Sequence, residues 1–311
     1  MSWILVALLA YLFLAIANLF DKFLVDNVLP SSKAYAFVAC FFGGIVILGA
    51  PWFLQWPGFY WLMINLLSGA IFAVALWLLY EALRRGEASQ TLVFVGGLTP
   101  IFSITFSVLF FKEQFSALEW VGIITLLLGI FIVAILPKQR HFLTRVLNKL
   151  KLTQDIKTGS LVFALGSAFF YSTYFLLTKY AYSEQTFASA FIWNRVGAAL
   201  FVLIFLIKAS DRKIIFNTFK NPKKNKNGML VILNQDLGSA GFILQNYAIF
   251  LGSVALVNAL QGVQYAFLLV ISSVLAVLSP KLLKETFSWR IFLQKSLAVI
   301  VIAMGLYFIL I

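Results

Sequence analysis

The chain has 311 residues, of which 62% are hydrophobic and only 11% are charged. A water-soluble protein of this length needs many more charged residues to cover its surface, so the composition excludes a soluble globular fold and places the chain in a lipid bilayer. The formal net charge of +13 does not indicate a nucleic-acid partner, because the basic residues gather in a few loops between long apolar segments.

Apolar segments of about 20 residues, the length at which an α-helix spans a bilayer core, follow one another along the chain. The alternating pattern of outer-membrane β-strands is absent, and a helix satisfies its own backbone hydrogen bonds inside lipid. The first segment has no basic start and no small-residue cleavage pattern, so we expect it to stay as a span. Ten spans are predicted, at residues 3–20, 34–53, 59–83, 89–111, 118–136, 159–179, 187–207, 229–251, 253–278 and 289–311.

Two connectors are long and basic. Residues 137–158 have Phe142, Val146 and Leu150 at helical spacing among Lys and Arg residues, which indicates a helix lying on the membrane surface. Residues 208–228 contain the sequence KNPKKNKNG and are expected to form a solvated loop. The charged residues around the end of the third span are likewise expected to be solvated; they are Glu81, Arg84, Arg85 and Glu87.

The two halves resemble each other at four places in the same order. Residues 11–22 (YLFLAIANLFDK) align with 168–179 (AFFYSTYFLLTK), and FKEQFSALEW at 111–120 aligns with LKETFSWRIF at 283–292. Because each half has an odd number of spans, equivalent helices must cross the membrane in opposite directions. We therefore predict an all-α integral membrane protein with ten transmembrane helices as two inverted five-helix repeats. The first repeat is 1–137, a basic connector is 138–158, and the second repeat is 159–311.

Lys and Arg are distributed very unevenly between the two faces of this predicted bundle. The odd-numbered loops are those that join spans 1 and 2, 3 and 4, 5 and 6, 7 and 8, and 9 and 10. Of the 24 Lys and Arg residues, all except Lys112, Lys179 and Arg195 fall in or beside these loops. Cytoplasmic loops carry the excess of basic residues, so we expect a multi-pass protein of the cell membrane with these loops in the cytoplasm and both termini outside.

Polar side chains inside the apolar spans are candidates for function, because burying them in hydrocarbon costs free energy. They gather in the second half, which favours a polar, aromatic-lined cavity near the midplane that is lined mainly by that half. The alternative is that individual Asn and Gln side chains form interhelical hydrogen bonds that hold the helices together. The candidate substrate-binding residues are Asn18, Tyr171, Tyr174, Asn194, Arg195, Gln235, Asp236, Asn258, Gln261 and Tyr265.

Arg195 and Asp236 are the charged residues of this set. Asp236 lies about 12 Å into its helix by the rise per residue, and Arg195 lies at a similar depth from the opposite face. Their backbones should then differ in height by roughly 6 Å within a core of about 30 Å, which an extended Arg side chain can bridge. Three roles stay open: a structural ion pair, Asp236 as a proton-carrying coupling residue, and Arg195 as the site for an anionic substrate group.

The whole pattern resembles the EamA-type members of the drug/metabolite transporter superfamily. The two five-helix halves carry the resemblance, together with residues 82–133, where Pro100 precedes Glu113 at a helix exit and Gly122 and Gly129 follow. It implies a central cavity built from the first four helices of each half, with the fifth and tenth helices at the periphery. The second repeat lacks an equivalent of Pro100. Many bacterial relatives also place both termini in the cytoplasm, against the charge distribution here.

These observations predict a secondary transporter that moves a small polar metabolite, such as an amino acid, by alternating access. The expected partners are the small-molecule substrate and a bilayer containing anionic lipids, without nucleic acid; a homodimer is compatible with the sequence. No enzyme activity, cofactor or metal is expected, since Cys40 is the single cysteine and His141 the single histidine. The alternatives are a transporter or flippase for lipid-linked or nucleotide-sugar substrates and, less favoured, an integral-membrane enzyme.

Overall fold

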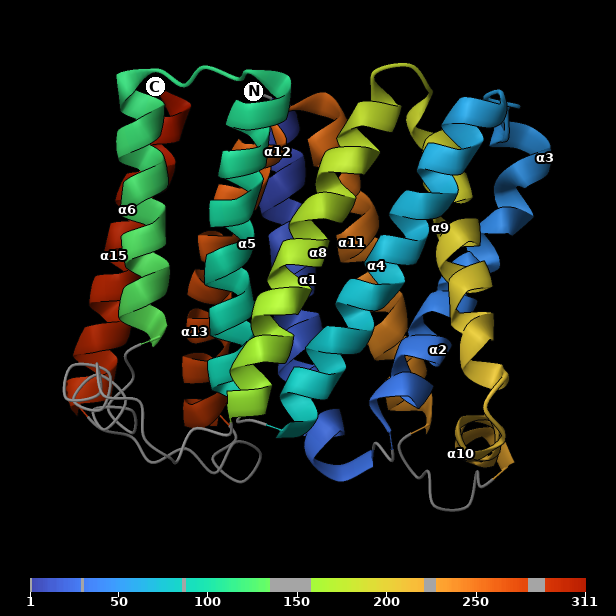
Figure 1. The fold of residues 1–311 in the computed structure, drawn as a ribbon. Helices are drawn as coiled ribbons and strands as arrows, with labels where there is room; N and C mark the ends of the chain where they lie inside the picture. The colour runs from blue at the N-terminus through green and yellow to red at the C-terminus, as the bar shows by residue number, and fades with distance from the viewer. Residues whose placement is uncertain (1, 29–30, 86–87, 135–157, 221–227, 279–288) are drawn as a thin grey trace.

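The computed structural model describes residues 2–28, 31–85, 88–134, 158–220, 228–278 and 289–311. They form a bundle of helices that stand side by side, with both termini at the same end (Figure 1). No strand occurs within these ranges, which confirms the all-helical fold. The predicted surface helix in residues 137–158 lies outside the described residues, except for its last position.

Each apolar segment predicted from the sequence coincides with helical structure. The first half contains α1 (Ser2–Val28), α2 (Ser32–Gly43), the 3-10 helix η1 (Gly44–Gly49), α3 (Ala50–Phe53), α4 (Phe59–Arg85), α5 (Ala88–Phe111) and α6 (Ala117–Ala134). The second half contains α8 (Thr158–Tyr182), α9 (Phe187–Val202), the 3-10 helix η3 (Leu203–Leu206), α10 (Ala209–Lys220), α11 (Gly228–Leu251), α12 (Val254–Ala259), α13 (Gln261–Leu278) and α15 (Trp289–Leu310).

Several of these helices have the length and composition of membrane spans. Five qualify on both counts within the described ranges: Ser32–Phe53, Phe59–Arg85, Phe94–Phe111, Gly159–Tyr182 and Phe187–Leu206. Shorter apolar helices lie at Trp3–Asn18, Ala117–Ile132, Val254–Leu268 and Ser296–Leu310. The outer surface of the bundle is apolar, with side chains such as Trp52 and Leu5 exposed by 77% and 70%. A surface of this kind suits hydrocarbon rather than water.

The packing of the helices joins the two halves rather than separating them. Helix α4 packs against α8 and α9, α1 packs against α11 and α13, and α5 packs against α8. Helices α6 and α15 form a pair at one edge of the bundle (Figure 1). The core is therefore built mainly from contacts between segments far apart in the sequence.

Three glycines allow α6 and α15 to approach closely. A Cβ on Gly305 would lie 2.8 Å from the Leu126 backbone nitrogen and 3.0 Å from the Gly122 carbonyl oxygen, and a Cβ on Gly129 would lie 2.5 Å from Ile302. Small residues at helix interfaces are the usual means of tight packing in membranes, where lipid removes the hydrophobic drive between helices. Gly122, Gly129 and Gly305 are therefore close-packing positions of this helix pair.

Two charged regions differ from their prediction as solvated segments. Residues 209–220 form helix α10, because Ile215 is buried at 1% exposure and Lys33 pairs with Asp211 at 2.6 Å. Glu81 is also buried, since Ser32 donates to its carboxylate and two arginines at the end of α4 bond to it. Those partners are Arg84 at 2.7 Å and Arg85 at 2.6 Å. Arg84, Arg85 and most described side chains of α10 stay exposed as predicted, so local partners replace water only at Glu81 and Asp211.

Proline is expected to interrupt a helix, yet the fourth span of the first half, which contains Pro100, is continuous. Its counterpart in the second half, which has no proline at that place, is divided. Helix α5 runs without interruption across Pro100, whereas the predicted ninth span is divided into α12 and α13 at Leu260. Leu260 keeps right-handed helical angles, with φ −65° and ψ −4°, and its N–H still bonds to the Leu256 carbonyl at 3.1 Å, so the division is one tightened turn rather than an unwound segment. It separates Asn258 from Gln261 at the level of the pocket described below.

We predict that Gly305→Ala destabilises the bundle by about 1–3 kcal/mol, because the new methyl group meets backbone atoms of α6 that cannot move aside. Thermal unfolding of the detergent-solubilised protein measures the effect. Met304→Ala is the matched control, since Met304 is 50% exposed on the same helix. Equal melting temperatures for the two variants would contradict the close α6–α15 contact.

Candidate functional site

A pocket of about 250 Å³ lies in the centre of the bundle. Its described lining comes from α1, α2 with η1, α4, α5, α8, α9, α11 and α13, and none of it from α6 or α15. This arrangement is the one that the family resemblance implies. The polar side chains of the lining are Asn18, Tyr80, Thr99, Tyr171, Arg195, Ser239, Gln245, Gln261, Gln264 and Tyr265.

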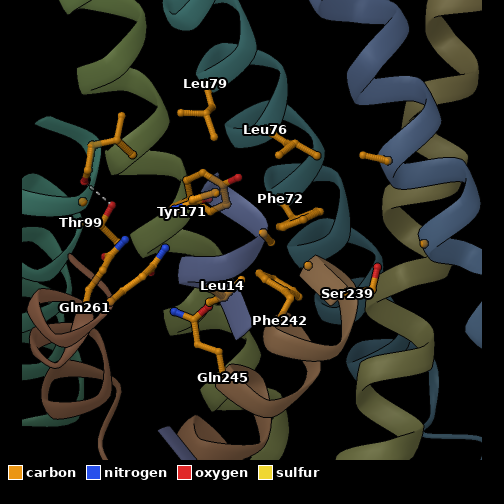
Figure 2. A pocket seen from close by; sticks show the side chains of 18 of the residues that line it. Leu14, Phe72, Leu76, Leu79, Thr99, Tyr171, Ser239, Phe242, Gln245 and Gln261 are labelled. Carbon is orange, nitrogen blue, oxygen red and sulfur yellow. Dashed lines mark hydrogen bonds between the residues drawn. The ribbon is translucent and has the colours of Figure 1, made fainter. Parts of the chain in front are cut away.

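Aromatic rings from three helices form one wall of the pocket. Phe72 on α4, Tyr171 on α8 and Phe242 on α11 lie close together around it (Figure 2). The ring centre of Phe72 is 5.0 Å from that of Phe242 and 5.9 Å from that of Tyr171. Contacts of this geometry add to simple apolar burial, so they tie α4, α8 and α11 together around the cavity.

Arg195 lines the pocket and is only 6% exposed. Its guanidinium carbon lies 4.0 Å from the ring centre of Phe72, 4.8 Å from that of Phe242 and 5.2 Å from that of Phe191. Its Nη2 donates a hydrogen bond of 3.0 Å to the Tyr174 hydroxyl, while its Nε has no partner. The rings attract the cation through their π faces and hold the planar group in one orientation.

A layer of buried hydrogen bonds supports Arg195 from behind. The Tyr174 hydroxyl donates to Asn246 Oδ1 at 2.8 Å, and the Asn246 side chain donates to the Phe242 carbonyl at 2.9 Å. On the same helix as Tyr174, Thr178 shares a hydrogen bond of 2.8 Å with Ser68 of α4. These contacts fix α8 against α4 and α11, so Arg195 rests on a rigid base.

Amide side chains form a second network on the opposite side. Gln245 donates to Asn258 Oδ1 at 3.4 Å, and Asn258 donates to Ser103 Oγ at 2.9 Å. Gln245 also approaches the hydroxyl of Tyr11 at 3.4 Å, and that hydroxyl donates to the Val257 carbonyl at 2.6 Å. Helices α1, α5, α11 and α12 meet in this network. Gln245 faces the pocket while Asn258 lies behind it.

Tyr265 and Gly96 form a close contact between the two halves. The Tyr265 hydroxyl donates to the Leu92 carbonyl at 2.7 Å. A Cβ on Gly96 would lie 1.8 Å from that hydroxyl oxygen, so any side chain at this position would displace the ring. The glycine thus lets a ring of the second half rest on the backbone of α5 inside the pocket wall.

At the end of the bundle that holds the termini, Lys179 of α8 bonds to the end of α11. Lys179 Nζ donates to the carbonyls of Ile249, Phe250 and Gly252 at 2.9, 3.2 and 2.7 Å, where α11 ends. Toward the other end the lining reaches Tyr80 and Leu92. These residues lie about one and a half helical turns from the end of α4 and the start of α5.

The structure places the predicted binding residues at different depths. Asn18, Tyr171, Arg195, Gln261 and Tyr265 line the pocket. The side chains of Tyr174, Asn194 and Asn258 are fully buried outside the described lining, and Tyr174 and Asn258 hold the helices together as interhelical hydrogen-bonding groups do. The side chain of Gln235 lies outside the described residues.

The expected ion pair between Arg195 and Asp236 is absent from the described residues. Asp236 is exposed and does not belong to the described lining, and Arg195 bonds to Tyr174 instead. Depth along a helix does not fix the direction in which a side chain leaves the helix. Asp236 precedes Phe242 by six residues, which turns its Cβ by about 120° from that ring on an ideal helix.

The first half contributes more of the pocket than we expected. Thr99 and the rings and aliphatic groups of α4 form much of the wall, whereas the sequence pointed mainly to the second half (Figure 2). Phe72 and Thr99 carry no local signal that separates them from ordinary apolar or helix-bonded residues. Ser239 also lines the pocket, and it follows the predicted Asp236 by one helical turn.

The side chains of the described part of the chain offer no group of three His, Cys, Asp or Glu residues that could hold a metal ion. The pocket's polar groups are amides, hydroxyls and one guanidinium. Such groups bind and orient a ligand by hydrogen bonds and charge.

Comparisons with known proteins agree with this geometry. The EamA-like transporter family matches residues 1–135, which confirms the resemblance read from the sequence. No curated protein matches the chain. Among the solved structures it matches, one crystal structure superposes with a TM-score of 0.62 over 98% of each chain at 15% sequence identity. That likeness concerns the fold alone. Residues 1–135 thus match the EamA-like transporter family, and the protein is a multi-pass membrane protein.

Proposed function

We propose that the protein is a secondary transporter that moves a small polar metabolite through the central pocket by alternating access. The observation that carries this proposal is the pocket itself, enclosed between helices of both halves and lined by amides, hydroxyls, aromatic rings and Arg195. Its volume of about 250 Å³ lies below the range of drug-sized sites, which favours a metabolite. Asn18, Tyr171, Arg195, Gln261 and Tyr265 are the proposed contact residues.

The packing supports two inverted repeats of five helices, at residues 1–137 and 159–311. Exchanging the halves turns the α4–α8 contact into the α11–α1 contact, and the α5–α8 contact into the α13–α1 contact; both members of each pair are present. The α6–α15 contact maps onto itself. Helix α1 begins at the end where the termini lie, whereas its counterpart α8 begins at the opposite end (Figure 1).

One helix contact has no equivalent when the halves are exchanged, and it suggests how access alternates. Helices α4 and α9 touch through glycines: a Cβ on Gly69 would lie 2.0 Å from the Asn194 carbonyl oxygen, and one on Gly197 would lie 2.5 Å from that of Leu66. The counterparts, α11 and α2, form no comparable contact among the described residues. We propose that the α4–α9 seam is closed here and that it opens when α2 and α11 close.

Polar groups buried near this seam favour the same movement. Asn65 Oδ1, Gln185 Nε2 and both side-chain polar atoms of Asn194 are buried without a hydrogen-bond partner. Buried polar groups without partners are rare and costly. If the seam opens to water, these atoms become hydrated, so the closed state bears a cost that the open state relieves. The two states can then differ by little free energy, as a carrier requires.

A flippase for lipid-linked substrates is the second candidate. Gly43 of α2 and Ser239 of α11 both line the pocket, a Cβ on Gly43 would meet nothing within 4 Å, and Ser239 is exposed. Since α2 and α11 do not pack closely, this side offers a route between pocket and lipid. The basic end is proposed to face the cytoplasm and the termini the outside, in agreement with the charge distribution.

The main test is transport into proteoliposomes by the full-length protein, screened across amino acids, organic acids, sugars and nucleotide sugars. We expect uptake of at least one class, and we expect Ala39→Phe to abolish it by filling the pocket that Ala39 lines. The control Ala303→Phe places the same bulk on an exposed position of α15. Uptake that Ala39→Phe leaves intact contradicts the pocket as the route. Movement of a labelled lipid-linked sugar alone supports the flippase.

The proposed seam makes a second prediction. Gly197→Ala should push α9 away from α4 and raise the labelling of Asn65→Cys, in a Cys40→Ser background, by an impermeant thiol reagent added from the side of the termini. We expect an increase of several-fold. Gly166→Ala is the control, because its Cβ would meet only the end of the Leu78 side chain, at 3.2 Å. Unchanged labelling would show that the seam does not control access.

Asp236 remains the proposed coupling residue, because it is exposed on α11 one turn from Ser239. We predict that Asp236→Asn removes the stimulation of transport by a pH gradient while transport without a gradient persists, since the amide cannot carry a proton. Asp211→Asn is the control, because Asp211 pairs with Lys33 away from the pocket. A normal response to the gradient in Asp236→Asn excludes this role.

A further inference from the structure

We propose that the pocket selects small organic anions, and that Arg195 binds their carboxylate or equivalent anionic group. This inference rests on the proposed function and narrows its substrate class. It departs from the expectation of an amino acid, whose ammonium group would need a binding partner of its own.

The charge of the pocket is the first argument. Arg195 is the single charged side chain of the described lining, and no carboxylate accompanies it there. Ion pairs found elsewhere among the described residues, such as Glu81 with Arg84, leave Arg195 out. A buried cation without a counter-ion is costly. A bound anion supplies the missing negative charge, so the empty pocket is already complementary to one.

The hydrogen bonds of Arg195 give the second argument. A guanidinium has five N–H donors, and its planar fork matches the two oxygens of a carboxylate. In the structure Nη2 bonds to the Tyr174 hydroxyl and Nε has no partner. The aromatic rings at 4.0 to 5.2 Å neutralise the cation in part, but ring faces do not replace oxygen acceptors.

The same rings argue against a cationic substrate. Aromatic faces bind ammonium groups when they surround an empty space. Here Phe72, Phe242 and Phe191 are occupied by the guanidinium carbon at 4.0, 4.8 and 5.2 Å. An ammonium group in the pocket would therefore meet a like charge and no carboxylate, since Asp236 lies outside the described lining.

The remaining groups suit the neutral part of such an anion. Gln245 and Gln261 supply amides on one side of the pocket, and Phe72 and Tyr171 supply apolar and ring surface on the other (Figure 2). Gln264 adds a third amide to the lining. A ligand with a carboxylate at Arg195 can place hydroxyl or carbonyl groups against the amides and its hydrocarbon against the rings.

The test compares compounds that share a skeleton and differ in charge. Full-length protein in detergent is titrated with 3-phenylpropionate, its amide, the corresponding amine and phenylalanine, and with hexanoate, hexanamide, hexylamine and norleucine. Binding is read from the shift in melting temperature, and uptake of the same compounds is measured in proteoliposomes. We expect each carboxylate to bind at least about ten-fold more tightly than its amide, a difference that corresponds to about 1.4 kcal/mol, and the amine to bind most weakly.

Variants separate a binding role of Arg195 from a structural one. Arg195→Gln should remove the preference for the carboxylate over its amide, and Arg195→Lys should keep part of it because the charge remains. Lys33→Gln removes the same charge outside the pocket and should change neither affinity. If Arg195→Gln fails to fold, the Arg195→Lys protein still decides, because it should lose bidentate binding and weaken carboxylates more than amides.

The outcomes distinguish this inference from the proposed function. If neutral, zwitterionic or cationic compounds bind as tightly as anions, or if Arg195→Gln keeps the carboxylate preference, the inference is wrong while transport stands. If no compound in this set or in the wider screen binds or is transported, the proposed function fails and the inference fails with it.

Discussion

The hydrocarbon around the bundle is the constraint on which the structure depends. Lipid offers no hydrogen bonds, so every backbone group in a span must be satisfied within its helix, and polar side chains are tolerated only where they face one another or a cavity. The same solvent removes the hydrophobic drive for helices to associate. Close backbone contact and interhelical hydrogen bonds must then hold the bundle together, and both are concentrated between the two halves.

If access alternates as proposed, these contacts divide the molecule into a part that stays packed and a part that moves. Glycine contacts fix α6 to α15 at the edge, and the Asn258–Ser103 and Thr178–Ser68 bonds fix helices of one half to those of the other. The contact between α4 and α9 is of another kind. It too joins bare backbones, but both polar atoms of the Asn194 amide and Asn65 Oδ1 are buried near it without a partner, while Asn65 Nδ2 donates to Gln185 Oε1. The helices pack tightly there although those polar atoms have no hydrogen-bond partner. Because opening the contact would hydrate these atoms, opening is expected to cost less free energy than it does elsewhere in the bundle.

The sequence predicted the helices well because their signal is physical and local: each span is a long apolar run that no other structure can carry across lipid. It also identified Arg195, Gln261 and Tyr265, because polar groups in such runs stand out. It could not show that Asp236 lies outside the described lining, because the direction of that side chain around α11 depends on which neighbour the helix meets. It also could not single out Phe72, whose apolar side chain is indistinguishable from one facing lipid. Glu81 was misjudged for a related reason, since its partner Ser32 comes from a helix whose position the sequence does not give.

The position of Arg195 connects ligand binding with the α4–α9 seam. Arg195 follows Asn194, whose carbonyl lies against Gly69 of α4, and its guanidinium lies 4.0 Å from the ring of Phe72 on the same helix α4. If α9 moves away from α4, the Arg195 guanidinium loses its contact with the Phe72 ring while water enters the opened seam. A bound anion compensates for the lost ring and for the change in hydration, whereas an empty pocket leaves the cation with less support. The free energy of opening then depends on whether the pocket is occupied, which is the condition that lets a substrate shift the balance between two access states.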